Sequence, residues 1–452
     1  MYADYASLGI LNAAGREIPF YNGKGQPEKS DEIKNTVFSF SLAVSVCVSA
    51  GILLYAAFSR FRLGPEIFYG LLFTSGLVLL QRFNALLIVF LRAYKEFSLA
   101  GRQMLYSALV NATLVGALSF RFKLYGFMIA MALSLVFNVV YIIRNRPFHF
   151  KIEWRPQRVR ALVFYGFPLF LIALFGSFFD TITKLLITKL MGLESLGVYS
   201  VALMTVASIH SVPNSIGIVV IPNLHEKYGK AENKADLKGY LEKAALAYST
   251  LIPLLVGLSW FVVPVVVRHW LPAFSEGIQP LRYLALSVYF MALVQGYSQF
   301  IYVIRKHLVL LPMLIFSCLV LFWTIRTAIH AGFGLEGVAT ASTLSFFVYF
   351  TMVYGYVAGH VYTAAEAVRR FASLMGRFAC LLLTVWVIGQ FVLLPDSLSR
   401  AAASSLLFLL AQAPFLIHLE KKLGILTGAL PPAFKRFWRP GFDILRANNR
   451  GK

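Results

Sequence analysis

A few charged side chains interrupt long apolar segments, and these are the residues whose chemistry could matter. Arg82 lies within the apolar segment 65–90, and its planar guanidinium is suited to binding phosphate through two hydrogen bonds. Asp180 and Lys184 lie four residues apart within segment 161–187, so they share a helical face and should form an ion pair. An ion at the centre of a membrane helix costs about 2.5 to 3.5 kcal/mol on insertion scales, so such charges are candidates for substrate contact.

Polar side chains on two further segments could line an aqueous path. His210 lies in the middle of segment 196–221, beside serine and asparagine residues on the same helical face. Gln295 and Gln299 are four residues apart within segment 278–303, so their amides also share one face. These groups could hydrogen-bond to the hydroxyl groups of a sugar.

Each of these residues also has a purely structural interpretation. Arg16 precedes the first complete apolar segment, and is either a phosphate contact at a membrane surface or a cationic anchor. Arg82 could instead hydrogen-bond to helix-end carbonyls or to Asn84, and the pair of Asp180 and Lys184 could simply neutralise two costly charges. The polar residues of the other two segments could join neighbouring helices.

Membrane-spanning helices must position these side chains. Of the 452 residues, 58% are apolar and 14% are charged, and the mean hydropathy is +0.70, which excludes a water-soluble enzyme. The apolar segments are near-continuous and long enough to cross a hydrocarbon core of ~30 Å, unlike the alternating strands of a transmembrane β-barrel. The sequence predicts an all-α polytopic membrane protein with twelve complete spans, at residues 36–58, 65–90, 104–120, 124–143, 161–187, 196–221, 244–267, 278–303, 308–325, 335–357, 378–395 and 401–417.

The basic residues alternate between the two sides of the predicted membrane. Lysine and arginine outnumber aspartate and glutamate by 42 to 20, and the loops on one side hold 31 of these cations whereas the opposite loops hold 8. The positive-inside rule therefore places the cation-rich loops and the C-terminus in the cytoplasm. The net charge of +22 thus reflects topology and does not indicate a nucleic-acid partner.

An internal repeat indicates two related halves. Five residues of one segment recur at an offset of 211, Leu124, Gly126, Ala130, Leu133 and Ser134 matching Leu335, Gly337, Ala341, Leu344 and Ser345. The matched elements point the same way through the membrane, which is typical of a parallel repeat. Ile18-Pro19 likewise matches Ile221-Pro222, but two complete spans precede only the second pair. We interpret the first half as lacking its first helix, with a partial helix remaining at about residues 4–13.

The predicted organisation has five parts. They are an N-terminal helix bundle at 1–143, a basic cytoplasmic linker at 144–160, a C-terminal bundle at 161–357, two extra transmembrane helices at 358–417 and a basic cytoplasmic tail at 418–452. The three cysteines all lie in apolar segments, and no metal-binding or nucleophile motif is present in the sequence. We therefore expect no cofactor, no metal and no enzymatic activity.

Several motifs resemble those of bacterial polysaccharide flippases. The stretch from Leu8 to Gly25, the sequence Tyr165-Gly-Phe-Pro168, Asp180, and the turn from Met191 to Ser200 are similar to these proteins. They are the O-antigen and lipid-linked oligosaccharide translocases of the multidrug/oligosaccharidyl-lipid/polysaccharide (MOP) superfamily. The resemblance covers essentially the whole chain and implies two six-helix bundles followed by two extra helices.

The resemblance also implies a function and partners. Such a protein would flip polyprenyl-diphosphate-linked oligosaccharide units across the bacterial cytoplasmic (inner) membrane by alternating access, for lipopolysaccharide O-antigen, capsule or exopolysaccharide synthesis. Its partners would be that substrate and membrane lipids, with a polysaccharide polymerase and chain-length proteins as further candidates, and no nucleic acid.

Other interpretations of the chain make different demands on its sequence. A multidrug or cation antiporter of the same superfamily would need buried carboxylates, and the first half has only Glu66, at the edge of a span. An inactive truncated copy is the other alternative. A membrane polymerase or ligase is disfavoured because every predicted outer loop is about ten residues or shorter.

Overall fold

The structure is a computed structural model that describes residues 8–61, 64–146, 148–231, 234–304, 306–391 and 398–423. Throughout these ranges the regular secondary structure is helical. The α-helices are α2 (Ile10–Gly23), α3 (Pro27–Phe58), α4 (Pro65–Ala93), α5 (Phe97–Asn145), α6 (Pro156–Met191), α7 (Leu193–Ala231), α8 (Lys234–Trp270), α9 (Ile278–Ala285), α10 (Ser287–Val303), α11 (Leu310–His330), α12 (Gly334–Val361), α13 (Ala364–Phe391) and α14 (Leu398–Leu423), with two short 3-10 helices at Pro272–Gly277 and His307–Val309. The prediction of an all-helical protein is confirmed.

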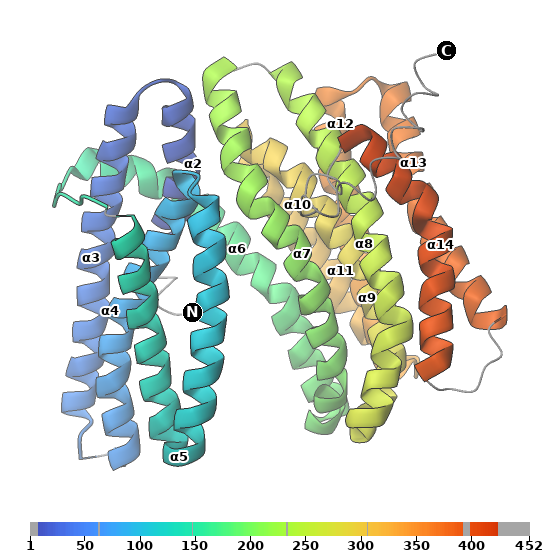
Figure 1. Ribbon diagram of the computed structural model, residues 1–452, viewed down its shortest axis with the longest axis horizontal. Coiled ribbons are helices and arrows are strands. Elements are labelled where there is room, and N and C mark those ends of the chain that lie inside the picture. The colour runs from blue at the N-terminus through green and yellow to red at the C-terminus, as the bar shows by residue number, and fades with distance from the viewer. Residues whose placement is uncertain are drawn as a thin grey trace, which may run out of the picture. The chain divides into compact units, whose positions relative to one another are not determined.

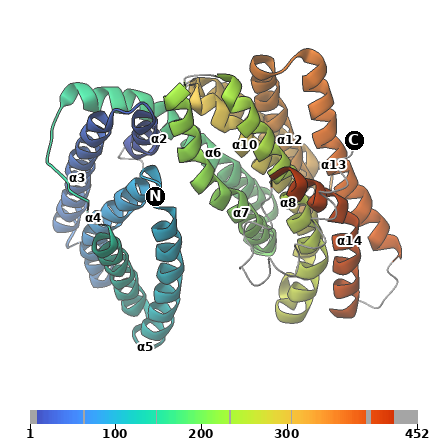
Figure 2. The ribbon, with the colours of Figure 1, turned by 45° about the horizontal axis from the view of Figure 1, so that its top comes forward.

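The number of membrane spans also agrees with the prediction. Eleven helical stretches within the described residues are long and apolar enough to cross a membrane. One of them, α5, has 49 residues and is interrupted at Lys123, whose φ and ψ are 50° and −124°. Its two arms fold back on each other, since Gln103 donates a hydrogen bond to Asn138 at 2.9 Å and Asn138 donates one to Ser107 at 3.0 Å (Figure 2). The arms correspond to the predicted spans 104–120 and 124–143.

The chain forms two compact units. The first comprises residues 1–174 and 216–233, and the second comprises residues 175–215 and 234–452. The chain passes between them within α6, again within α7, and a third time where α8 begins. The five-part organisation set out above stays a prediction, and most of its basic tail, from residue 424 onward, lies outside the described residues.

The core of the first unit forms where α2 packs against α3 and α4 (Figure 1). Ile10, Ala13, Ala14 and Ile18 are fully buried on one face of α2. The partial helix therefore extends to Gly23, well beyond the predicted end at residue 13, because its apolar face continues to be buried past that point.

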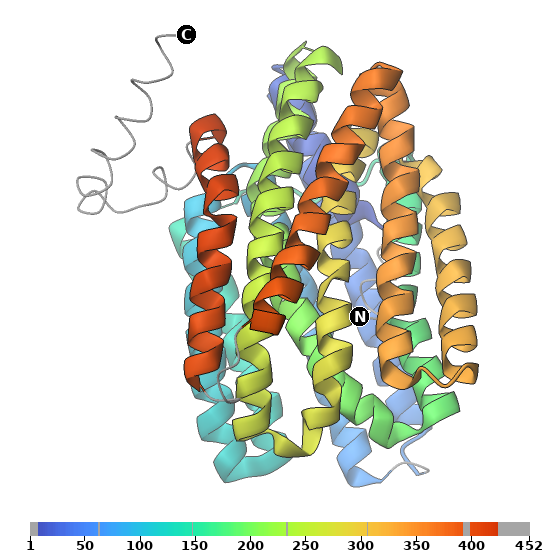
Figure 3. The same cartoon turned by 90° about the vertical axis from the view of Figure 1, so that its right-hand side faces the viewer.

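The second unit is built around α8, α10 and α12, which pack against one another. The stretch formed by α9, α10 and the preceding 3-10 helix is more deeply buried than the other candidate spans, at 78% of its most apolar window. The two C-terminal helices α13 and α14 pack against α8 (Figure 3). Gly257 of α8 allows this approach, because a Cβ atom there would lie 2.0 Å from the ring of the fully buried Phe408 of α14.

Candidate functional site

Arg82 lies in a cavity of the first unit. Its side chain is only 6% exposed on α4, and it lines a space of about 380 Å³ between α3 and α4. Ser41 and Ser45 of α3 supply the other polar groups of this cavity, whereas Phe38 and Phe83 are among its apolar walls. The structure thus keeps the Arg82 guanidinium within the protein, where a lowered dielectric strengthens its attraction for an anion.

A row of small polar residues accompanies Arg82 along α3. Ser41, Ser45 and Ser49 are buried at four-residue intervals, and Ser49 donates a hydrogen bond to the carbonyl of Ser75 on α4 at 2.9 Å. Small residues let two helix backbones approach closely in a membrane. These serines were not among the predicted site residues, although their spacing of four in the sequence could have revealed them.

Arg16 belongs to the same unit as Arg82 and lies on α2. Its side chain is half-buried, and the adjacent Glu17 is buried, at 9% exposed. Glu17 was not predicted to be a buried carboxylate, because it lies between the predicted partial helix at 4–13 and the first predicted complete span at 36–58. In the structure this position lies inside a helix that packs on α3 and α4.

The predicted ion pair of the second unit is not formed. Asp180 and Lys184 are both exposed on α6, and within the described part of the chain no ion pair joins them. The charge of Asp180 instead interacts with His210 and Tyr199 of α7. The expectation was wrong because spacing along a helix shows a shared face but not which neighbouring helix attracts each side chain.

A chain of hydrogen bonds connects α7 with α10. The Nδ2 atom of Asn214 lies 3.4 Å from Nδ1 of His210, and Nε2 of Gln295 donates to Oδ1 of Asn214 at 3.1 Å. Gln299 follows one turn later on α10. The Oε1 atoms of Gln295 and Gln299 are buried and accept no hydrogen bond from the residues that the structure describes.

We refer to Asp180, His210, Asn214, Gln295 and Gln299 as the polar stripe. It draws on three helices, and it includes four of the seven predicted site residues. Two buried acceptor oxygens without donors are costly unless a ligand or water satisfies them. The stripe can therefore receive hydroxyl or amide donors.

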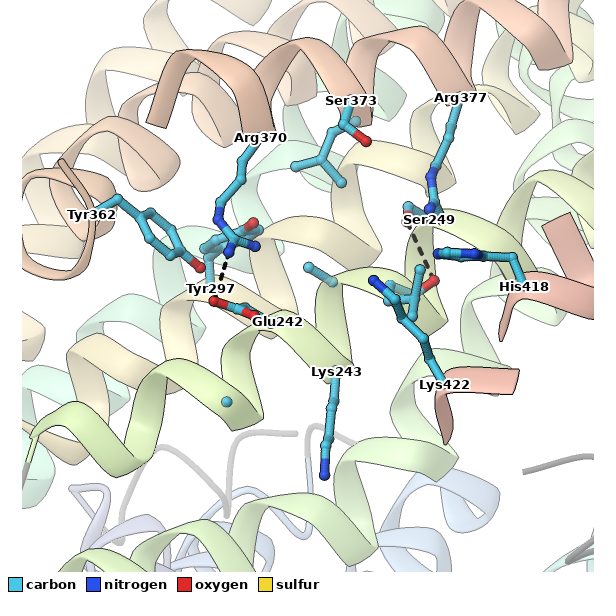
Figure 4. Close-up of a pocket in the computed structure, with 14 residues that line it drawn as sticks. Glu242, Lys243, Ser249, Tyr297, Tyr362, Arg370, Ser373, Arg377, His418 and Lys422 are labelled. Atoms are coloured by element: carbon cyan, nitrogen blue, oxygen red, sulfur yellow. Dashed lines mark hydrogen bonds and ion pairs between the residues drawn. The ribbon is translucent and has the colours of Figure 1, made fainter. Parts of the chain in front are cut away.

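A second pocket in this unit was not predicted. Figure 4 shows it between α8, α13 and α14, with a volume of about 400 Å³. We call it the basic pocket and define it by Glu242, Lys243, Arg370, Arg377, His418 and Lys422, which line it. In the sequence its basic residues served only to orient the chain in the membrane. One feature of the sequence could have indicated the pocket, since Arg370 and Arg377 are seven residues apart and so share a helical face.

Two arginines of the basic pocket have defined partners. Arg370 forms an ion pair with Glu242 at 2.8 Å, and Nη1 of Arg377 donates to the hydroxyls of Ser249 at 3.0 Å and Thr250 at 2.7 Å. Burial raises the pKa of the nearby Tyr362 phenol above its ordinary value, and the positive charge of Arg370 partly opposes this rise. Tyr362 thus remains a neutral hydrogen-bonding group at the rim of the pocket.

The described residues offer no candidate metal site. No group of three histidine, cysteine, aspartate or glutamate side chains in these ranges could hold an ion, and Cys47, Cys318 and Cys380 are free thiols. The candidate sites accordingly consist of cations and uncharged polar groups set among apolar helices.

Comparison with known families assigns the chain to one of them. The profile of a family described as polysaccharide biosynthesis protein matches residues 24–272, more than half of the sequence. The chain belongs to this family. No curated protein sequence matches it. The matched region of the polysaccharide biosynthesis family contains Arg82, Asp180, Lys184 and His210, whereas Gln295 and Gln299 lie beyond it.

Solved structures resemble this polysaccharide biosynthesis protein in fold. An outward-facing multidrug resistance MATE family transporter of the MOP superfamily aligns with a TM-score of 0.68 and 15% identity, covering 82% of this chain and 85% of the other. A MATE protein in the bent conformation gives a TM-score of 0.67 and 16% identity, with coverages of 83% and 86%. A MOP superfamily transporter from Pyrococcus furiosus, with a binding pocket described as reversed in polarity, gives 0.66 and 16%, with coverages of 79% and 85%.

Together these comparisons confirm the resemblance to a polysaccharide biosynthesis family with a MOP transporter fold. The polysaccharide biosynthesis family and the MOP transporter fold coincide in one multi-pass membrane protein. At identities of 15 to 16%, the structural likeness shows the fold alone.

Proposed function

We propose that this protein flips polyprenyl-diphosphate-linked oligosaccharide units across the bacterial cytoplasmic membrane by alternating access. The observation that carries the proposal is membership of a polysaccharide biosynthesis family by a chain with a transporter fold. The sugar units of surface polysaccharides are hydrophilic, so a membrane protein of such a pathway that has this fold is well suited to carry them across. O-antigen, capsule and exopolysaccharide units are the candidate cargoes.

The substrate's diphosphate would bind to the arginines of the first unit. Arg82 is buried beside a cavity, so a phosphate that reaches it would interact with a cation shielded from bulk water. A guanidinium can donate two parallel hydrogen bonds to a phosphate, which fixes the orientation of the headgroup. We assign first capture to Arg16 and retention to Arg82.

The glycan would bind to the polar stripe of the second unit. The Oε1 atoms of Gln295 and Gln299 are hydrogen-bond acceptors, and sugar hydroxyls are donors of the right size for them. Lys184, which is exposed and not paired with Asp180, would receive the diphosphate in a later step. Alternating access would then require the substrate to contact the two sets of residues at different stages.

The multidrug antiporter alternative is supported by structural likeness and by the buried carboxylate of Glu17. The MATE family transporter named above is described as a multidrug resistance protein, but it is only 15% identical to this chain. The family match, by contrast, names polysaccharide biosynthesis. We therefore favour the oligosaccharide substrate over cationic drugs.

The proposal is tested by deleting the gene in its host and locating the lipid-linked repeat units. We expect them to accumulate on the cytoplasmic leaflet of the deletion strain, and plasmid-borne wild-type protein should restore their export. Unchanged surface glycan in the deletion strain, together with increased sensitivity to cationic drugs, would contradict the proposal and favour the antiporter.

A further inference from the structure

The basic pocket has an excess of positive charge that its own residues do not neutralise. Four cationic side chains and one carboxylate line it. The carboxylate, Glu242, is paired with Arg370. Among the described residues, Arg377 and Lys422 have no carboxylate partner. A pocket with this balance of charge attracts an anion.

Two of the unneutralised cations and a histidine converge on one wall of the pocket. Figure 4 shows Arg377 of α13 and His418 and Lys422 of α14 pointing toward one another around Ser249 of α8, whereas Lys243 points away. Mutual repulsion between Arg377 and Lys422 is relieved when an anion binds between them.

Arg377 is held in position for this contact. Its Nη1 atom donates to Ser249 and Thr250, and its guanidinium lies 5.8 Å from the centre of the Phe415 ring. These contacts come from α8 and α14, so the guanidinium is fixed from two sides while its remaining N–H groups stay available. An arginine held in this way is suited to phosphate, because less side-chain freedom is lost on binding.

The position of the pocket along its helices indicates a lipid ligand. It lies where α13 begins and α14 ends, and Arg377 directly precedes the predicted span 378–395. This is the membrane face that the basic loops assign to the cytoplasm, at the depth where lipid phosphates lie. Leu246 and Leu374 add apolar surface beside the cations, as a headgroup attached to hydrocarbon chains requires.

We propose that the basic pocket binds the phosphate group of a lipid, through Arg377 and Lys422 with His418 beside them. Two lipids share this chemistry, namely an anionic membrane phospholipid and the diphosphate end of the lipid-linked oligosaccharide. Only the second rests on the proposed transport function. In the first case the pocket anchors α13 and α14 to the leaflet, and in the second it gathers substrate at the surface of the second unit.

The test measures lipid binding to the purified full-length chain in detergent by native mass spectrometry. The ligands are dioleoylphosphatidylglycerol, a polyprenyl diphosphate, and dioleoylglycerol, which has the same acyl chains as the first but no phosphate. K422Q removes a side chain that makes no ion pair with the described residues, so this variant should fold normally. K421Q is the matched control, because Lys421 is the exposed neighbour that does not line the pocket.

We expect K422Q to weaken binding of a phosphate-bearing lipid about fivefold, and R377Q/K422Q to weaken it further, while K421Q binds like the wild type. Loss of polyprenyl diphosphate binding alone would identify the substrate as the source, and loss of phosphatidylglycerol binding alone would identify the membrane lipid. Equal affinities of the wild type and K422Q for both phosphate lipids, or equally tight binding of dioleoylglycerol by the wild type, would overturn the proposal. Phosphatidylglycerol binding that depends on Lys422 would support the pocket even if the chain transported no oligosaccharide.

Discussion

Gln295 donates a hydrogen bond from Nε2 to Oδ1 of Asn214 at 3.1 Å, and this contact joins α10 to α7. Asn214 in turn contacts His210 at 3.4 Å. The bond uses the donor side of the Gln295 amide and leaves its Oε1 atom facing no donor among the described residues. The second unit therefore presents an oriented acceptor, and the next turn of α10 presents another on Gln299.

Replacing Gln299 tests whether this residue binds substrate or only stabilises the protein. In the described part of the chain its Oε1 atom has no hydrogen-bond partner, so Q299L should leave the protein as stable as the wild type or stabilise it slightly. Loss of an acceptor for sugar hydroxyls should nevertheless reduce the transport rate about threefold to tenfold, as expected for one lost hydrogen bond. Q390L, at an exposed position of α13, is the control. Wild-type transport by Q299L would remove this residue from the glycan site.

Arg82 is the residue whose replacement should most impair transport. Hydrogen bonds to charged groups contribute about 1.5 to 3 kcal/mol, so R82A should slow transport at least tenfold. R82K should recover part of the rate, since lysine keeps the charge but not the paired hydrogen-bond geometry. R102A on α5 is the matched control, because Arg102 is exposed. Complementation of a deletion strain and membrane immunoblots would measure activity and insertion separately, and full activity of R82A at normal abundance would refute its role.

Gly257 should be intolerant of any side chain. A Cβ atom there would overlap the ring of Phe408, which is fully buried. G257A is therefore expected to lower the free energy of unfolding by about 1 to 3 kcal/mol, as overpacking does. Thermal stability in detergent, followed by size-exclusion chromatography, measures this change. G389A, where nothing lies within 4 Å of a new Cβ atom, should leave the stability almost unchanged.

The ion pair between Glu242 and Arg370 should matter little for stability. Both side chains are about one third exposed, at 33% and 31%, so solvent screens their attraction. We expect E242Q to change the free energy of unfolding by less than about 1 kcal/mol. It should at the same time raise the affinity of the basic pocket for phosphate lipids, because it removes the only carboxylate among the residues that line this pocket. Weaker phosphate binding by E242Q would show that Glu242 positions Arg370 for the ligand.

Much of the fold follows from the sequence because membrane helices have a strong signal. Long apolar runs predict the spans, and the cationic break at Arg121 and Lys123 divides α5 into the two arms that the structure shows. Residues 14–23 were less predictable. They lie beyond the predicted partial helix at 4–13 and include charged residues and Pro19, whereas burial of Ala14 and Ile18 against α3 and α4 keeps them helical.

The candidate sites were only partly predictable for a different reason. Helical spacing placed Gln295 and Gln299 on one face, but it could not show that Asp180 would interact with α7 and not with Lys184. Arg370 and Arg377 were not predicted to line a pocket, because a cation beside a span usually marks the cytoplasmic side. Only the packing of α13 and α14 on α8 brings Arg377 close to Lys422.

The central claim is tested most directly by reconstituting the chain into liposomes that contain a fluorescently labelled polyprenyl-diphosphate-linked oligosaccharide. A membrane-impermeant reagent that modifies the glycan reports which leaflet holds the substrate. Wild-type protein should make nearly all of the labelled lipid accessible over time, whereas R82A liposomes should retain about half in the protected inner leaflet. Equal protection in wild-type and protein-free liposomes, with the protein folded and inserted, would contradict the proposed function.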